Sequence, residues 1–414
     1  MGSIDTKSLK IVVQSSSYRG ICLLLGIITA YATISPLTIY SSTTLELFSY
    51  ALFCIIAFYL CSKESKNGIR DKNARLLCFI CFLFAFIIPI LIHLQMPFTT
   101  DILQWVTIFL IVTLTDNNRV TILNTAVTIL TIVVLLAIIE YIIGYITGVS
   151  VQLATVYNES SVFSRTSYFT HSFFNLYWEG ELQHRFQALT SEPGHLGAIC
   201  GFMVGFLPFN KKYRKNILVF LLAGILSLSL AFYIYLLFIV IYKLIAKQIG
   251  FKLLFVLVTI VVATAYIFQE PIQKAIVERI LYKDQVDNRT GDTANKFIEN
   301  LFTSSETFYG VGNRTAYKGE EGSNQGNAGL KWKLYQYGVC GVGFYFLGMY
   351  FLYRRFRNRN VSMLFGILFF LLYFYSVANW GIPIFMLLLF TTLPIDNRKR
   401  KNELNSSTKQ VVLN

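Results

Sequence analysis

The sequence predicts an all-α membrane protein with about twelve transmembrane helices and two large loops on the outer side of the membrane. Of the 414 residues, 55% are hydrophobic and only 14% are charged, whereas soluble proteins carry about 25% charged residues. Apolar runs of about 18 residues or more recur, and each is long enough to cross a bilayer. Basic residues gather in several short connections between these runs, as in cytoplasmic loops.

The apolar runs give the candidate spans in order: 20–40, 44–61, 76–95, 102–115, 120–147, 193–209, 217–242, 253–268, 336–352, 361–377 and 381–394. The run 217–242 lies between two basic segments, 210–216 and 243–252, which a single span would place on opposite sides. We therefore predict a hairpin of two short helices that turns at "LSLSL" (226–230), which gives twelve crossings. The alternative is eleven crossings, with 269–335 on the cytoplasmic side.

The charge distribution predicts the orientation. The net charge is +14, and the basic side chains cluster in short connections, for example in 210–216 and 354–360. The positive-inside rule then places both termini and the 396–414 tail in the cytoplasm, and the whole chain, 1–414, is expected to form a single integral membrane domain. Because the positive charge follows one side of the membrane, no nucleic-acid partner is expected.

The two long loops, 148–192 and 269–335, are therefore outer loops. Both are expected to contain short amphipathic helices, and the clearest apolar periodicity lies at 271–283 and 291–302. The seven cysteines lie in or beside apolar runs, which gives neither a disulfide framework nor the spacing of a metal site. No metal and no other cofactor are expected.

The stretch "SEPGHLG" (191–197) predicts a helix that begins at the end of the first outer loop. Pro193 suits the first helical position, because its missing N–H would have no partner there, and Ser191 or Glu192 would cap the helix. The positive end of the helix dipole favours an anion such as a phosphate. Arg185 could add a bidentate guanidinium contact to the same anion.

Two further features lie inside the predicted spans. Gly197, Gly201 and Gly205 recur every four residues, which predicts a helix face on which another helix packs closely. Glu140 is a carboxylate near the outer end of the span 120–147. Intramembrane carboxylates are often functional, but snorkelling or a helix-packing partner explains this one equally well.

These motifs resemble those of the Wzy-type polysaccharide polymerases and the related O-antigen ligases. A basic residue precedes "SEPGHLG", and "YGVGNR" (309–314) in the second outer loop is followed by a "YGVCGVGFYF" span (337–346). The resemblance implies a glycosyltransferase C-like membrane fold and an inverting, metal-independent glycosyltransferase at the outer face of a bacterial plasma membrane. Its substrates would be oligosaccharides linked to undecaprenyl pyrophosphate.

Within this resemblance, the leaving pyrophosphate requires cationic donors that are already in place. We expect Arg185, Arg289 and Arg314 to bind it. A base must accept the proton of the attacking sugar hydroxyl, and we expect Glu192 to do so, with His195 or His184 behind it; these three are the candidate catalytic residues.

Three functions in polysaccharide assembly remain open: polymerase, ligase and flippase. A polymerase would extend O-antigen, capsular or exopolysaccharide chains, whereas a ligase would transfer the chain to lipid A core. The absence of histidine from 269–335 favours the polymerase, because the ligases are expected to use a histidine there. A flippase for the same lipid-linked sugars is the third possibility. Further partners of a polymerase would be membrane lipid, a chain-length regulator and a separate flippase.

Overall fold

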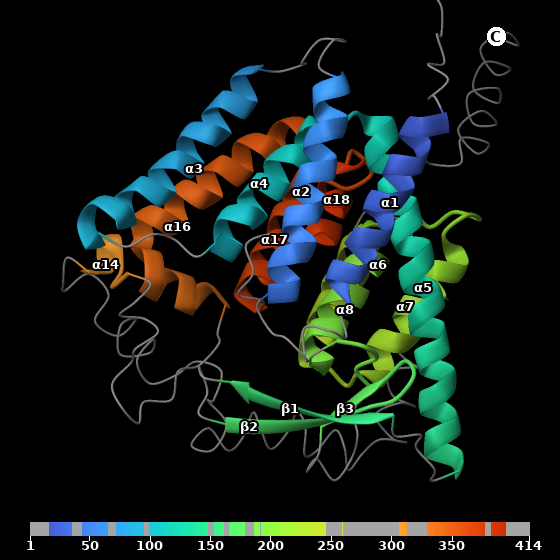
Figure 1. The fold of residues 1–414 in the computed structure, drawn as a ribbon. Coiled ribbons are helices and arrows are strands. Elements are labelled where there is room, and N and C mark those ends of the chain that lie inside the picture. Colours follow the sequence, from blue (N-terminus) through green and yellow to red (C-terminus); the bar gives the residue numbers. More distant parts are fainter. Residues whose placement is uncertain are drawn as a thin grey trace, which may run out of the picture.

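The computed structural model of the chain is mainly helical, as the sequence predicts (Figure 1). The residues that it describes are 16–34, 44–64, 72–94, 99–147, 153–160, 165–178, 186–190, 192–245, 259, 306–312, 329–376 and 382–394. The predicted span 253–268, the predicted amphipathic helices at 271–283 and 291–302, and the tail 396–414 lie outside these residues, apart from residue 259.

The elements follow the predicted order of apolar runs. The N-terminal half comprises α1 (Ser16–Thr33), α2 (Thr44–Glu64), α3 (Lys72–His93), α4 (Thr99–Thr113), α5 (Asp116–Thr147), β1 (Ala154–Ser160), β2 (Arg165–His171) and β3 (Leu176–Trp178). The C-terminal half comprises α6 (Pro193–Phe206), α7 (Arg214–Leu226), α8 (Leu230–Ile245), α14 (Glu306–Tyr309), α16 (Gly329–Phe356), α17 (Met363–Ser376) and α18 (Pro383–Phe390). Each predicted span within the described residues therefore contains a helix, although α18 is only 8 residues long.

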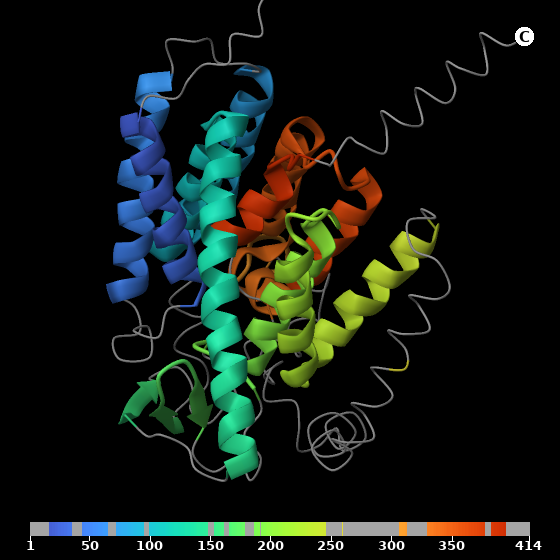
Figure 2. The same ribbon diagram turned by 90° about the vertical axis from the view of Figure 1, so that its right-hand side faces the viewer.

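The predicted hairpin between two basic segments is confirmed. The apolar run 217–242 is divided into α7 and α8 by a turn at Ser227–Ser229, within the "LSLSL" segment. Leu228 has a positive φ of 48°, and the amide of Ser227 still donates to the carbonyl of Ala223. Figure 2 shows α8 leaving this turn towards the end of the bundle from which α7 arrived.

One expectation for the first outer loop is wrong. Its described residues form an antiparallel sheet with the strand order β1-β2-β3, and not short amphipathic helices. The register pairs Ala154 with His171 and Ser160 with Arg165, and then Phe169 with Trp178. The reason lies in the local composition, because Thr, Val, Tyr and Phe recur in "ATVYNES" and "RTSYFTH" and such residues favour strands.

The helix bundle has two chemically different ends. The connections after α4, α6, α16 and α18 meet at one end, where the Asn358 amide donates to the Leu389 carbonyl (2.6 Å) and Asn210 Nδ2 donates to the Pro394 carbonyl (3.2 Å). Basic side chains gather there: Arg75, Arg119, Lys211, Lys212, Arg214, Lys215, Lys243, Arg354, Arg355, Arg357 and Arg359. The sheet lies beyond the opposite end (Figures 1 and 2), where the acidic residues Asp101, Glu140, Glu192 and Glu306 are found together with Lys333. We call these two ends of the bundle the basic end and the acidic end.

Many large apolar side chains remain exposed along the helices between these ends. Examples are Ile55, Phe58, Leu91 and Leu237, each at least 60% exposed. Among the residues that the structure describes, α5 alone is both long and apolar enough to cross a membrane. The protein therefore has a helix suited to membrane association.

The glycine face predicted for α6 is packed against its neighbouring helices. Gly197 lies against Ser229, Gly201 against Tyr235 and Gly205 against Phe369, so the glycines of α6 face α8 and α17. A Cβ atom on Gly201 would lie only 2.8 Å from Tyr235 Cβ. The prediction that these glycines serve close helix packing is confirmed, and α6 is firmly held where it carries the candidate site.

Candidate functional site

The start of α6 has the local structure that its sequence predicts. Pro193 occupies the first helical turn, and Glu192 is the N-cap residue, with extended backbone angles (φ −148°, ψ 144°). The Glu192 side chain does not cap the helix by a hydrogen bond, and the residue is exposed. Its carboxylate therefore lies at the protein surface, beside the positive end of the helix dipole.

His195 lies one helical turn into α6. Its imidazole Nε2 is buried and has no hydrogen-bond partner, while its amide donates to the Glu192 carbonyl at 3.1 Å. A buried polar atom without a partner costs about 1–3 kcal/mol, and such atoms in native proteins call for an explanation such as a binding or catalytic role. An exposed carboxylate and an unsatisfied imidazole nitrogen thus begin the same helix.

The segment that leads into Glu192 is tied to its surroundings. The Leu176 amide of β3 donates to the Ala188 carbonyl at 2.9 Å, and the Thr190 hydroxyl lies 2.9 Å from the Glu192 carbonyl oxygen. The buried ring of Phe186 packs edge-on against Tyr141 of α5, with ring centroids 5.3 Å apart. The approach to α6 is therefore held by both the sheet and α5.

Glu140 of α5 anchors the turn between β2 and β3. Its Oε1 accepts the Phe173 amide (3.1 Å), and its Oε2 accepts the Phe174 amide (2.8 Å) and Asn175 Nδ2 (2.9 Å). Asn175 Nδ2 also lies 2.9 Å from the Ala137 carbonyl oxygen. The hydrogen-bond partners that the structure gives Glu140 thus lie in a loop turn, and not on a neighbouring helix as one of the sequence interpretations proposed.

The two glycine-rich motifs, "YGVG" (309–312) and "YGVCGVGFYF" (337–346), lie against each other. Gly310 and Gly338 have positive φ angles of 74° and 66°, and a Cβ on Gly338 would approach the Gly310 nitrogen to 2.4 Å. Only glycine permits both the backbone angles and this approach. Gly338 also interrupts α16, which divides the helix into an outer part and a longer inner part.

A buried polar cluster lies beside this contact, and sequence reasoning missed it. Lys333 Nζ donates to Asp101 Oδ1 and Oδ2 at 3.1 and 3.0 Å and to Gln336 Oε1 at 3.3 Å. The Tyr337 hydroxyl donates to Asp101 Oδ2 as well. Burial lowers the pKa of Lys333, which precedes the predicted span at 336–352, while Asp101 opposes this shift. The sequence does show an acidic residue, Asp101, near the start of α4 and a basic residue, Lys333, near the start of α16. Nothing in the sequence indicates that these two residues pair with each other.

The remaining candidate residues, His184, Arg185, Arg289 and Arg314, lie outside the described residues. The structure thus positions Glu192 and His195 but does not test whether the three arginines converge. Among the residues that the structure describes, no three His, Cys, Asp or Glu side chains are grouped to hold a metal ion.

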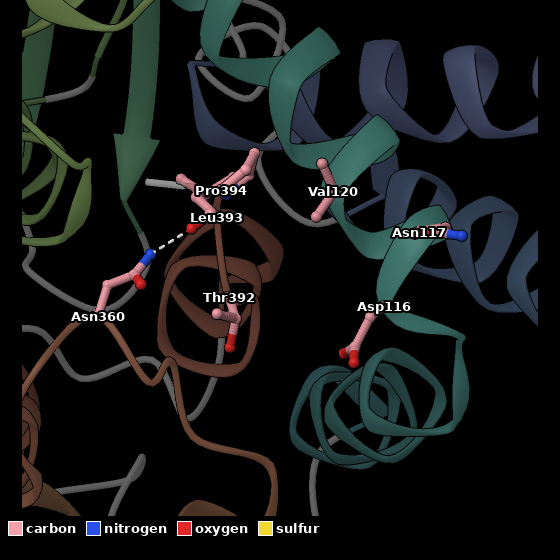
Figure 3. Close-up of a pocket in the computed structure, with 7 residues that line it drawn as sticks. All are labelled: Asp116, Asn117, Val120, Asn360, Thr392, Leu393 and Pro394. Atoms are coloured by element: carbon pink, nitrogen blue, oxygen red, sulfur yellow. Dashed lines mark hydrogen bonds between the residues drawn. The ribbon is translucent and has the colours of Figure 1, made fainter. Parts of the chain in front are cut away.

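One pocket of the bundle lies away from this chemistry. Figure 3 shows it at the basic end, lined by Asp116, Asn117, Val120, Asn360, Thr392, Leu393 and Pro394. Its Asn360 Nδ2 donates to the Leu393 carbonyl, so the pocket is formed where the connections after α4, α16 and α18 meet.

Comparisons with protein-family models, with characterised proteins and with solved structures gave no match to this chain. The proposed function therefore depends on the chemistry of the candidate site and on the sequence motifs.

Proposed function

We propose that the chain is a multi-pass protein of a bacterial plasma membrane, with both termini in the cytoplasm and the sheet on the outer side. Two observations support this placement. The basic residues named above lie in the connections and helix ends at one end of the bundle, as the positive-inside rule requires of the cytoplasmic end. Large apolar side chains stay exposed along the helices, which is unfavourable in water but suits contact with lipid.

The proposed activity is polymerisation of oligosaccharide repeat units linked to undecaprenyl pyrophosphate. The observation that carries this proposal is the arrangement at the acidic end. Glu192 and His195 begin α6 there, and the "YGVG" segment (309–312) is bonded to α16 at the same end. The two motif regions that resemble the polymerases thus lie at one end of the bundle, and in the proposed placement this end faces the lipid-linked substrates.

The proposed reaction needs a base and a set of cationic groups that stabilise the leaving pyrophosphate. A hydroxyl oxygen of the acceptor sugar attacks the anomeric carbon of the donor chain, and its proton passes to the exposed carboxylate of Glu192, with His195 or His184 behind it. The bond between the anomeric carbon and the pyrophosphate oxygen breaks, and the carrier leaves as undecaprenyl pyrophosphate. Attack from the opposite side inverts the anomeric centre. Arg185, Arg289 and Arg314 are proposed to stabilise the negative charge on the leaving group.

Transfer of the finished chain to lipid A core by a ligase is the nearest alternative. The second outer loop, 269–335, contains no histidine, whereas the resemblance to the ligases leads us to expect one. This absence favours a polymerase. A flippase would require polar groups along the spans, and the charged side chains described here lie towards the helix ends.

The test measures the length of surface polysaccharide in cells that depend on this gene. Glu192→Gln, His195→Ala, Arg185→Ala and Arg314→Ala are each expected to reduce long chains to single capped repeat units at normal protein levels. Arg359→Ala, an arginine at the basic end, is the matched control and should leave the chain length unchanged.

The outcomes separate the alternatives. Long chains in all four variants would refute the proposed site. Complete loss of surface sugar, without capped single repeats, would indicate a flippase. Normal polymer that is no longer attached to lipid A core would indicate a ligase.

A further inference from the structure

The buried cluster of Asp101, Lys333, Gln336 and Tyr337 joins α4 to the outer part of α16. Asp101 and Lys333 are each only 5% exposed, although they are 232 positions apart in the sequence. Lys333 Nζ has three oxygen acceptors within 3.3 Å, and Asp101 accepts from Tyr337 as well. A buried ion pair is tolerated when its hydrogen bonds are satisfied in this way, and it then fixes the relative position of the two helices.

This cluster also fixes the backbone to which the "YGVG" segment is bonded. The Val311 amide donates to the Tyr335 carbonyl at 2.9 Å, and the Gly312 amide donates to the Gln336 carbonyl at 3.2 Å. Both carbonyls directly precede the interruption of α16 at Gly338, where a helix leaves its last carbonyl groups without their usual partners. The loop thus supplies the partners that the interrupted helix requires.

We propose that Asp101, Lys333 and Tyr337 are positioning residues that hold residues 310–312, from which the chain continues to Arg314. They hold the outer part of α16, and its Tyr335 and Gln336 carbonyls hold residues 310–312. The chain reaches Arg314 two residues after Gly312. This inference rests on the proposed function in one respect, since it assumes that Arg314 binds the pyrophosphate.

The test compares amide hydrogen exchange of the full-length protein in detergent micelles, measured by mass spectrometry. In Asp101→Asn the amides of residues 310–312 should exchange faster by roughly a hundredfold or more, because Lys333 loses its buried counter-charge. Tyr337→Phe removes one hydrogen bond to the carboxylate and should accelerate the same amides about tenfold. Tyr337→Phe keeps the ion pair, so it reports on the inference even if Asp101→Asn does not fold.

Two controls separate positioning from general destabilisation. The Phe173 and Phe174 amides, which Glu140 holds at the same end of the bundle, should exchange at the wild-type rate in both variants. Asp116→Asn removes another helix-start carboxylate from its arginine partner, but at the basic end, and it should leave residues 310–312 protected.

The same variants are assayed for polysaccharide length. Faster exchange at 310–312 together with shorter chains supports the inference. Faster exchange with chains of normal length would leave the hold on residues 310–312 standing and refute its importance for the proposed activity, whereas Arg314→Ala tests Arg314 itself. Unchanged exchange at 310–312 in Tyr337→Phe, or equal acceleration at residues 173 and 174, would refute the positioning role itself.

Discussion

The glycine face of α6 allows a graded test of how closely this helix packs. A Cβ added at Gly201 would lie 2.8 Å from Tyr235 Cβ and Cδ2, whereas at Gly205 its nearest contacts would be 3.2 Å away, on the Phe369 ring. A Cβ at Gly343, in the inner part of α16, would meet nothing within 4 Å. Gly201→Ala, Gly205→Ala and Gly343→Ala therefore introduce the same atom into three different spaces.

The expected free energies follow from two opposing terms. Replacing a glycine by alanine inside a helix stabilises the folded state by about 0.8–1 kcal/mol, and this term is common to all three variants. Overpacking of a filled core costs about 1–3 kcal/mol, and it applies fully only at Gly201. The Tyr235 ring cannot easily move away, because it packs against both Phe202 and Phe369. Gly201→Ala should thus be about 1–3 kcal/mol less stable than Gly343→Ala, with Gly205→Ala between them.

The assay is thermal unfolding in detergent, followed with a dye that becomes fluorescent when it reacts with thiols. Cys22, Cys78 and Cys200 are fully buried, so the dye reacts as the protein unfolds, and Cys200 is the neighbour of Gly201. If Gly201→Ala unfolds at the same temperature as Gly343→Ala, the close contact between α6 and α8 is wrong.

Two further predictions concern the acidic end. Glu140→Gln should release the turn that contains Phe174, because an amide cannot accept all three hydrogen bonds that the carboxylate accepts. Limited proteolysis should then cleave this turn faster than in the wild type. Glu306 is an exposed carboxylate at the same end, and the control variant Glu306→Gln should be cleaved like the wild type. Gly338→Ala should lower the unfolding temperature, because it places a Cβ 2.4 Å from the Gly310 nitrogen on a left-handed backbone. Unfolding at the wild-type temperature would contradict the contact between the two glycines.

The sequence predicted those parts of the fold that depend on hydrophobic periodicity. Apolar runs located the helices, and two basic flanks divided 217–242 into a hairpin because a single span could not satisfy both. The spacing of Gly197, Gly201 and Gly205 predicted a packing face, since residues four apart share one side of a helix. In each case the signal is local, and the structure places Ser229, Tyr235 and Phe369 against that face.

The features that escaped prediction depend on contacts between distant residues or on a competing local preference. The pairing of Asp101 with Lys333 joins α4 to α16 across 232 positions of the sequence, and no local pattern encodes such a contact. The anchoring role of Glu140 likewise depends on where Phe173 and Phe174 lie in the fold. The sheet was not predicted, because β1 and β2 also contain polar residues and the segment was therefore interpreted as a loop.

The length of α5 has a consequence for where chemistry can occur. Its 32 residues extend about 48 Å at 1.5 Å per residue, whereas the hydrocarbon layer is about 30 Å thick. In the proposed membrane placement, an untilted α5 would extend about 18 Å in total beyond the lipid tails at its two ends, and its outer end would support the sheet through Glu140. In this placement the sugars would reach the start of α6 laterally, within the hydrated headgroup layer, while their polyprenyl anchors remain in the hydrocarbon layer of the membrane.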